Sequence, residues 1–416
     1  MVSFTEASII LLAIWFLVYY CRKDKSLTSK KYYILLFIMG AAGILLPMQE
    51  YLLQVTHEFN AFNIVLFAFL LLSVLLPWSK IDAWKRREYP LYRIKNRYIG
   101  AVKIFLLFII FSAIFAYVYC MPYAIMAYKM GGSEVRLLIA DSSLMPENIL
   151  STICYAVGYL APIQIVCFYL CLIDDRLNKF RFWVFLASLS YIVTTAPIQA
   201  RDGFIFIPLT YLFLYPICKN SINRETIVKF KRVLLLIGGV GFLLIATITF
   251  SRFSESTQYS SPIHGIIYGT YGYFYQQPYV FDNLLEYVPA TQGLSRRFPL
   301  LCKLFDIPIK EYIPQNALLE QSFSTMYGSF YMATGFSSLI IASLFFVISW
   351  SIVFSKHISR KNTSSLIICY SVFIYHVVSG LFYFRFSQES PMSLYLIIIV
   401  ISFFLPNIIE QKSPKN

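Results

Sequence analysis

The chain has 416 residues, of which 58% are hydrophobic and only 13% are charged, and its mean hydropathy is +0.65. A soluble domain of this size cannot cover so much apolar surface, so the composition excludes a soluble globular protein and indicates a polytopic membrane protein. The formal net charge of +14 also fits nucleic-acid binding, and the distribution of that charge along the chain decides between the two interpretations.

Apolar runs of about 17–25 residues recur along the whole chain, which is the length that crosses a hydrocarbon core as a helix. The runs are continuous in Leu, Ile, Phe and Val and lack the alternation of membrane β-strands. We therefore predict an all-α fold with about 11 transmembrane helices (10–12), forming one integral membrane domain over residues 1–416. The predicted spans are 4–21, 32–54, 61–78, 99–122, 149–173, 183–198, 203–218, 233–250, 326–354, 363–384 and 391–409.

Basic residues are concentrated in every second connection between these spans. The connections 22–31, 79–98, 174–182, 219–232, 355–362 and the C-terminal tail hold 25 of the 35 Lys and Arg residues, whereas the alternate connections hold nine. Positive charge is retained on the cytoplasmic side, so we predict an outer N-terminus and a cytoplasmic C-terminus. The basic excess then reflects topology and contact with anionic membrane lipid, and no nucleic-acid partner is expected.

Arginines stand between hydrophobic runs on the predicted outer side. Arg136 lies in the connection 123–148, and Arg201 lies in the short turn Gln199-Ala-Arg201-Asp202-Gly203. Such a residue is costly at a membrane surface unless it pairs or meets a ligand, and its fork of donors matches phosphate oxygens. Arg201 therefore either binds a phosphate or pyrophosphate or forms a turn with Asp202 that caps two helix ends. Arg136 is a further candidate for phosphate contact.

The segment 251–325 is predicted to be one large extracytoplasmic loop. It is too long for a simple linker and too aromatic for a disordered one. Tyr275 and Tyr279 lie in its most aromatic stretch, where glycines and amides accompany the rings, a composition typical of sugar-binding surfaces. We expect short helices on the membrane surface, separated at Pro262, Pro278, Pro289, Pro299, Pro308 and Pro314.

Candidates for acid–base and phosphate chemistry also lie in this loop. Arg252 opens it, either as an interface residue whose charge reaches the headgroups or as a second cation facing the phosphates. His264 is a candidate general base because its ordinary pKa lies near neutrality. Glu286 is a rival base, with Asp282 four residues earlier on the same helical face. For both residues the alternative is a solvated surface position without chemistry.

The run Tyr327-Gly328-Ser-Phe-Tyr331 opens the predicted span 326–354. Its small residues favour close helix packing, and the alternative is that Tyr327 and Tyr331 complete a sugar-binding cleft. The outer loops contain no Asp-x-Asp or Glu-x-Asp pair, and the four His residues are scattered. We therefore expect transfer chemistry without a metal or a cofactor.

With these features the chain resembles the bacterial O-antigen or oligosaccharide repeat-unit polymerases of the Wzy type. The resemblance covers the architecture of the whole chain, including the Arg201 turn and the outer loop that opens at Ser251-Arg252. Its most specific stretches are Tyr271-Gly-Tyr-Phe-Tyr-Gln-Gln-Pro-Tyr279, leading to Glu286, and Thr325-Met-Tyr327-Gly328-Ser-Phe-Tyr331.

The resemblance implies a glycosyltransferase of the bacterial inner membrane. Its substrate would be an oligosaccharide linked to undecaprenyl diphosphate, and a chain-length regulator is an implied partner. The growing glycan would be transferred to a sugar hydroxyl of the next lipid-linked repeat on the outer face. A lipid-linked oligosaccharide flippase or transporter and an O-antigen ligase stay open as alternatives, and a scaffold protein is disfavoured by the outer arginines.

Overall fold

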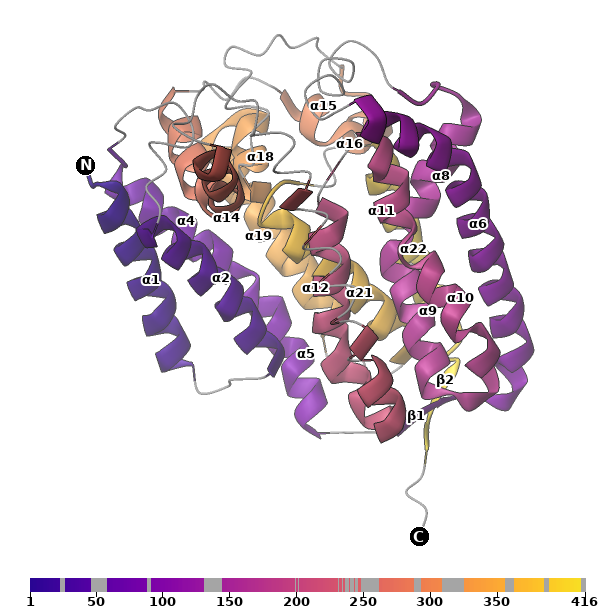
Figure 1. The fold of residues 1–416 in the computed structure, drawn as a ribbon. Helices are drawn as coiled ribbons and strands as arrows, with labels where there is room; N and C mark the ends of the chain where they lie inside the picture. The colour runs from indigo at the N-terminus through magenta and orange to yellow at the C-terminus, as the bar shows by residue number, and fades with distance from the viewer. Residues whose placement is uncertain are drawn as a thin grey trace. The chain divides into compact units, whose positions relative to one another are not determined.

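The computed structural model shows a helical protein whose chain divides into two compact units (Figure 1). Unit 1 consists of Met1–Arg86, Gln258–Ile358 and His376–Ser393, and unit 2 of Arg87–Thr257, Ser359–Tyr375 and Leu394–Asn416. The structure describes residues 1–22, 27–45, 58–87, 91–130, 144–198, 200, 202–230, 262–287, 293–308, 325–355, 363–384 and 389–412, with isolated positions between 232 and 247.

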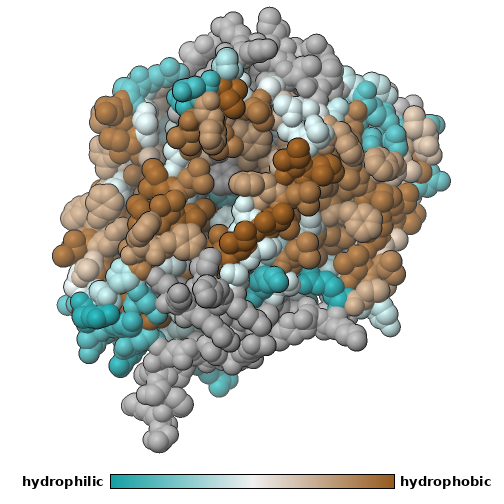
Figure 2. All heavy atoms as spheres, turned by 180° about the vertical axis from the view of Figure 1, so that it is seen from behind, coloured by the Kyte–Doolittle hydropathy of each residue, from teal (hydrophilic) through white to brown (hydrophobic). Residues whose placement is uncertain are grey.

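Within the described residues, six helical segments are long and apolar enough to cross a membrane, or seven if one bent pair counts as a span. The six are Phe4–Cys21, Ala61–Ile81, Asn96–Met130, Asp175–Ile198, Phe336–Val353 and Thr363–Gly380. This confirms the prediction of an all-α membrane protein, while the count of 11 and its orientation stay predictions. On the face drawn in Figure 2, apolar side chains cover the middle of the helices and polar ones gather toward their ends.

Unit 1 contains the helices that carry most of the predicted sugar-binding residues. They are α1 (Phe4–Cys21), α2 (Leu27–Leu45), α4 (Ala61–Ser73), α5 (Leu75–Arg87), α14 (Pro262–Tyr287), α15 (Gly293–Arg297), α16 (Pro299–Leu304), α18 (Thr325–Thr334) and α19 (Phe336–Val353). Ser3 and Glu6 form a capping box that starts α1, and the backbone of Val2 pairs with that of Phe59 before α4. Trp15 is buried and anchors α1 against α4 through a hydrogen bond from its Nε1 to the Ala68 carbonyl.

Unit 2 combines long helices with a short antiparallel sheet. Its elements are β1 (Leu91–Ile94), α6 (Ile99–Met130), α8 (Ile149–Tyr159), α9 (Ala161–Ile173), α10 (Arg181–Ala187), α11 (Ser190–Thr195), α12 (Asp202–Cys218) and β2 (Ile409–Lys412), together with the larger parts of α21 (Thr363–Gly380) and α22 (Glu389–Phe404). Four short 3-10 helices lie at Asn96–Tyr98, Asp175–Phe180, Ala196–Ile198 and Lys219–Ser221.

One end of unit 2 joins four segments that are distant in sequence. Strand β1 pairs with β2, from Leu91 opposite Lys412 to Ile94 opposite Ile409. The buried carboxylate of Asp174 accepts hydrogen bonds from the Ile94 amide and from Arg176. Four segments predicted to be cytoplasmic therefore meet at this end: the later part of 79–98, the connections 174–182 and 219–232, and the tail. The connection 219–232 is held by a hydrogen bond from the Tyr92 amide to the Ser221 hydroxyl.

Among the predicted helix bounds that differ from the structure, three differences depend on a glycine or a proline. The predicted span 326–354 is wrong as a single helix, because Gly335 has φ 90° and separates α18 from α19. The predicted span 149–173 bends by 51° between α8 and α9, where Pro162 starts a new helix and has no N–H to continue the first. Conversely, α14 runs without interruption through Pro278, so this proline does not separate two helices as predicted.

Candidate functional site

The structure divides the predicted site residues into two groups. Glu286, Tyr275 and Tyr279 lie on α14, and Tyr327 and Tyr331 lie on α18, all of them in unit 1. The structure describes neither Arg136, Arg201 and Arg252 nor the side chain of His264, although His264 belongs to the first turn of α14. The candidate site is therefore built here from α14, α18 and their neighbours in unit 1.

The middle of α14 is fixed against α1 and α2 by Tyr275. The Tyr275 hydroxyl lies 2.5 Å from the hydroxyl of Ser8, and the side chain is almost fully buried. Its ring occupies the space beside Gly43, where a Cβ would lie only 2.1 Å from a ring carbon. Burial raises the pKa of Tyr275 well above its ordinary value, although the Ser8 hydrogen bond opposes the shift, so the phenol stays neutral.

One turn later, Tyr279 packs on the aromatic residues at the start of the chain. Its ring is stacked at 6.1 Å from that of Phe4 and meets Phe59 edge-on at 6.4 Å. The side-chain amide of Asn283 donates to the Tyr279 carbonyl at 2.9 Å, within α14 just after Pro278. Only 9% of Tyr279 is exposed, so these contacts cover most of the residue.

Asp282 holds the last two turns of α14 on the start of α4. Its carboxylate is fully buried and accepts a hydrogen bond of 2.8 Å from the Asn63 amide, and the Asn60 backbone N–H lies 3.3 Å away. Such amide donors satisfy the hydrogen-bonding capacity of a buried carboxylate. Asp282 is therefore a positioning residue, and Glu286, one turn further on, keeps a half-buried carboxylate at the end of the helix.

Helix α18 lies beside α14 and starts from a strained backbone. Thr325 has φ 65°, and its hydroxyl accepts a hydrogen bond from the Tyr327 amide. Its own amide donates to the Phe382 carbonyl at 3.0 Å. A non-glycine residue persists in this conformation only where its surroundings impose it. The two hydrogen bonds of Thr325, with the Tyr327 amide and with the Phe382 carbonyl, thus fix the start of α18.

The two predicted tyrosines of α18 have different environments. Tyr327 is fully buried, and its hydroxyl lies 2.9 Å from that of Ser73. Tyr331 is half-buried and donates to the Leu285 carbonyl at 3.3 Å, next to Glu286 in the chain. Since the rings of Tyr275 and Tyr327 are covered, neither offers a face for stacking a sugar, and the structure assigns them a packing role. Tyr279 and Tyr331 keep partial access.

Arg297 is a cation of the predicted outer loop that was not among the residues selected from the sequence. The structure places it in α15 as a half-buried residue, with a guanidinium N–H donating to the Met332 sulfur at 3.3 Å. Tyr331 and Met332 are consecutive on α18, so this helix contacts the end of α14 that carries Glu286 and also the helix that carries Arg297. In the sequence, the signal for the partial burial of Arg297 was its position directly before the apolar run Phe298-Pro299-Leu300-Leu301.

Asp202, beside the predicted arginine turn, is engaged within unit 2. Its carboxylate accepts hydrogen bonds from the Tyr191 hydroxyl at 2.7 Å and from the Gly203 amide at 2.8 Å, at the first residue of α12. A carboxylate at a helix N-terminus compensates the free amides there. These contacts give Asp202 the capping role that was one of the two interpretations of this turn, and they leave Arg201 to be tested by experiment.

In the part of the chain that the structure describes, no group of three or more His, Cys, Asp or Glu residues is arranged to hold a metal ion. No protein-family model matches the chain, and neither a curated protein nor a solved structure matches it. The fold itself defines a helical membrane protein. An activity is argued below from the residues of α14, α15 and α18 in unit 1.

Proposed function

We propose that this protein is a bacterial surface-polysaccharide polymerase that extends a glycan on the outer face of the inner membrane. The observation that carries the proposal is the placement of Glu286. This carboxylate is half-buried at the end of a helix that Asp282, Tyr275 and Tyr279 fix in unit 1, beside the half-buried Tyr331. A carboxylate on a rigid, partly dry surface with aromatic neighbours suits proton removal from a sugar hydroxyl.

In the proposed reaction, a hydroxyl oxygen of the next lipid-linked repeat attacks the anomeric carbon of the growing glycan. The new glycosidic C–O bond forms as the bond between that carbon and the diphosphate oxygen breaks, and undecaprenyl diphosphate leaves with the electron pair. Glu286 accepts the hydroxyl proton, and His264 is the alternative base. General base catalysis of this kind contributes about 10²–10⁴-fold in rate.

The leaving diphosphate requires positive charge more than it requires a proton. Guanidinium groups bind phosphate oxygens through paired hydrogen bonds and stabilise charge that develops in the transition state. We assign this role to Arg201 and Arg252, with Arg136 as a further contact, and add Arg297, which lies across α18 from Glu286. The exposed edges of Tyr279 and Tyr331 would contact the sugar.

The test deletes the gene in its host, adds back the wild-type or a variant gene, and separates the surface polysaccharide on a gel. We expect deletion to collapse the ladder of polymer to a single repeat on its acceptor, and the wild-type gene to restore the ladder. Glu286→Gln, Arg201→Ala and Arg252→Ala should fail to restore it at normal protein levels. Glu225→Gln, an exposed carboxylate on a predicted cytoplasmic connection, is the matched control and should restore it.

Three outcomes would overturn the proposal. Accumulation of full-length polymer on the lipid carrier in the deletion strain would identify a ligase. Loss of every repeat from the outer leaflet would identify a flippase. A deletion strain with an unchanged ladder would remove the protein from this pathway altogether.

A further inference from the structure

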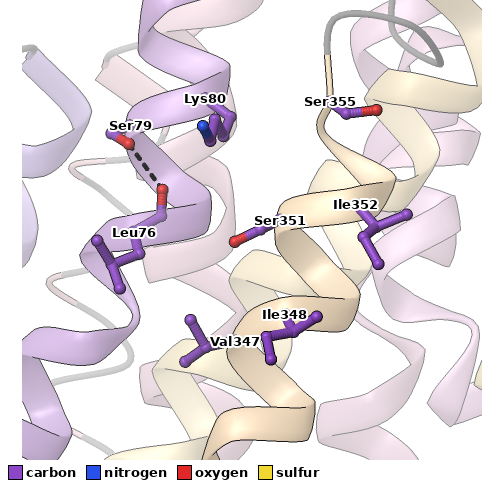
Figure 3. A pocket seen from close by; sticks show the side chains of 8 residues that line it. All are labelled: Leu76, Ser79, Lys80, Val347, Ile348, Ser351, Ile352 and Ser355. Carbon is purple, nitrogen blue, oxygen red and sulfur yellow. Dashed lines mark hydrogen bonds between the residues drawn. The ribbon is translucent and has the colours of Figure 1, made fainter.

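A groove between α5 and α19 in unit 1 is separate from the proposed catalytic region. Its volume is about 730 Å³, and it is open on one side. The lining residues are Leu76, Ser79, Lys80, Val347, Ile348, Ser351, Ile352 and Ser355 (Figure 3). Both helices belong to segments that can cross a membrane, and the groove lies at the C-terminal ends of both segments.

The two walls of the groove change from apolar to polar in the same direction. On α5, Leu76 is followed one turn later by Ser79 and Lys80. On the other wall, Val347 is followed at four-residue steps by Ser351 and by Ser355, which lies just after the end of α19. Four residues advance about 6 Å along a helix, so hydroxyl groups on both walls and the Lys80 ammonium follow the aliphatic residues within one or two turns. Figure 3 shows Leu76, Val347 and Ile348 toward one end and Lys80 and Ser355 toward the other, with Ile352 between Ser351 and Ser355.

The charge of the polar end is positive and is not neutralised by a carboxylate among the lining residues. Lys80 is exposed, and Ser351 and Ser355 add half-exposed hydroxyl groups that can donate hydrogen bonds. The sequence of α5 ends in Lys85, Arg86 and Arg87, and Lys356 follows Ser355. A basic segment next to a membrane helix attracts anionic lipid headgroups at the cytoplasmic surface.

We propose that this groove binds one anionic phospholipid, with its phosphodiester group at Lys80 and an acyl chain along Leu76, Val347 and Ile348. The match has three parts: an apolar wall on two helices that can cross a membrane, a cation at the end of that wall, and hydroxyl donors beside the cation. An ammonium and hydroxyl groups satisfy phosphate oxygens, while the aliphatic side chains replace contacts with other lipid tails. The site does not depend on the proposed polymerase activity.

The test measures lipid binding to the purified full chain in nanodiscs of phosphatidylcholine. A photoreactive phosphatidylglycerol probe, labelled in its acyl chain, is titrated into the wild type and into Lys80→Gln, and the crosslinked peptide is identified. We expect crosslinking to α5 or α19, and about fivefold weaker binding for Lys80→Gln. Lys103→Gln, on α6 in unit 2, removes the same charge outside the groove and should bind like the wild type.

A second variant tests the apolar wall. Val347→Trp places a large ring in the groove and should reduce crosslinking even though Lys80 is present. Equal binding of a phosphatidylcholine probe, an equal loss for Lys80→Gln and Lys103→Gln, or crosslinks confined to other helices would each overturn the proposal. Size-exclusion profiles that match the wild type show that the variants fold.

Discussion

At the scale of single residues, the position of α14 depends on a close approach that only glycine permits. Gly43 on α2 leaves room for the buried ring of Tyr275, whose hydroxyl meets that of Ser8 on α1. A methyl group at this position would overlap both the ring and the Ser8 oxygen, at 2.1 and 2.5 Å. The placement of Glu286 at the end of α14 therefore depends on a residue that has no chemistry of its own.

We predict that Gly43→Ala lowers the melting temperature of the detergent-purified protein and reduces polymer formation in the complementation assay. The expected cost is about 1–3 kcal/mol, which is typical of an extra carbon forced into a packed interior. Gly100→Ala in α6 is the control, since nothing lies within 4 Å of its added Cβ. The control should keep or slightly raise stability, because alanine favours a helix by about 1 kcal/mol over glycine. Equal melting temperatures for the two variants would contradict the packing argument.

At the scale of elements, the joined end of unit 2 depends on Asp174. Burial raises the pKa of its carboxyl group, but hydrogen bonds from the Arg176 side chain and from the amides of Arg176 and Ile94 outweigh it and hold the pKa below its ordinary value. A depressed pKa means that the folded state favours the charged form. The resulting stability is present above the ordinary carboxyl pKa and is lost as the pH falls through the folded-state value.

Asp174→Asn is therefore expected to destabilise the protein at neutral pH by about 1–3 kcal/mol, because a hydrogen-bonded buried charge is lost and Arg176 loses its partner. The difference in melting temperature from the wild type should shrink as the pH is lowered toward 4 and below. Asp175→Asn is the matched control. Its carboxylate pairs with Arg181 at 2.8 Å but is 89% exposed, so this variant should change stability little. A pH-independent difference for Asp174→Asn would show that charge is not the cause.

At the scale of the whole molecule, the predicted orientation can be tested by labelling. In a variant with the exposed Cys21 replaced by Ser, a membrane-impermeant maleimide applied to intact spheroplasts should label Lys303→Cys and not Arg224→Cys. Both positions are exposed, one on α16 in the predicted outer loop and the other after the 3-10 helix Lys219–Ser221. Permeabilised membranes should give label at both. Labelling of Arg224→Cys from outside would reverse the predicted topology.

Local features of the sequence already determined the class of the protein. Long apolar runs without charge can be satisfied only as helices in a bilayer, so the all-α membrane fold and the ends of α1 follow from composition and from the Ser3–Glu6 cap. Pro262 and Pro299 were predicted to separate helices, and each is the first residue of a helix, where the missing N–H carries no cost. Glu286 was selected from its neighbours in sequence, and the structure places it near the end of α14.

Contacts between distant segments were decided only by the tertiary structure. Tyr275 was predicted to lie on a sugar-binding surface, and Tyr327 either to pack in a helix or to complete a sugar-binding cleft. Ser8, Gly43 and Ser73 contact these two rings, and each of these partners is more than 200 residues away in the chain. The contact of Arg297 with Met332, 35 residues later, and the pairing of β1 with β2 were likewise visible only in the structure. A sequence pattern reports the polarity and the periodicity of one segment, whereas the burial of a ring or a charge depends on which other segment packs against it.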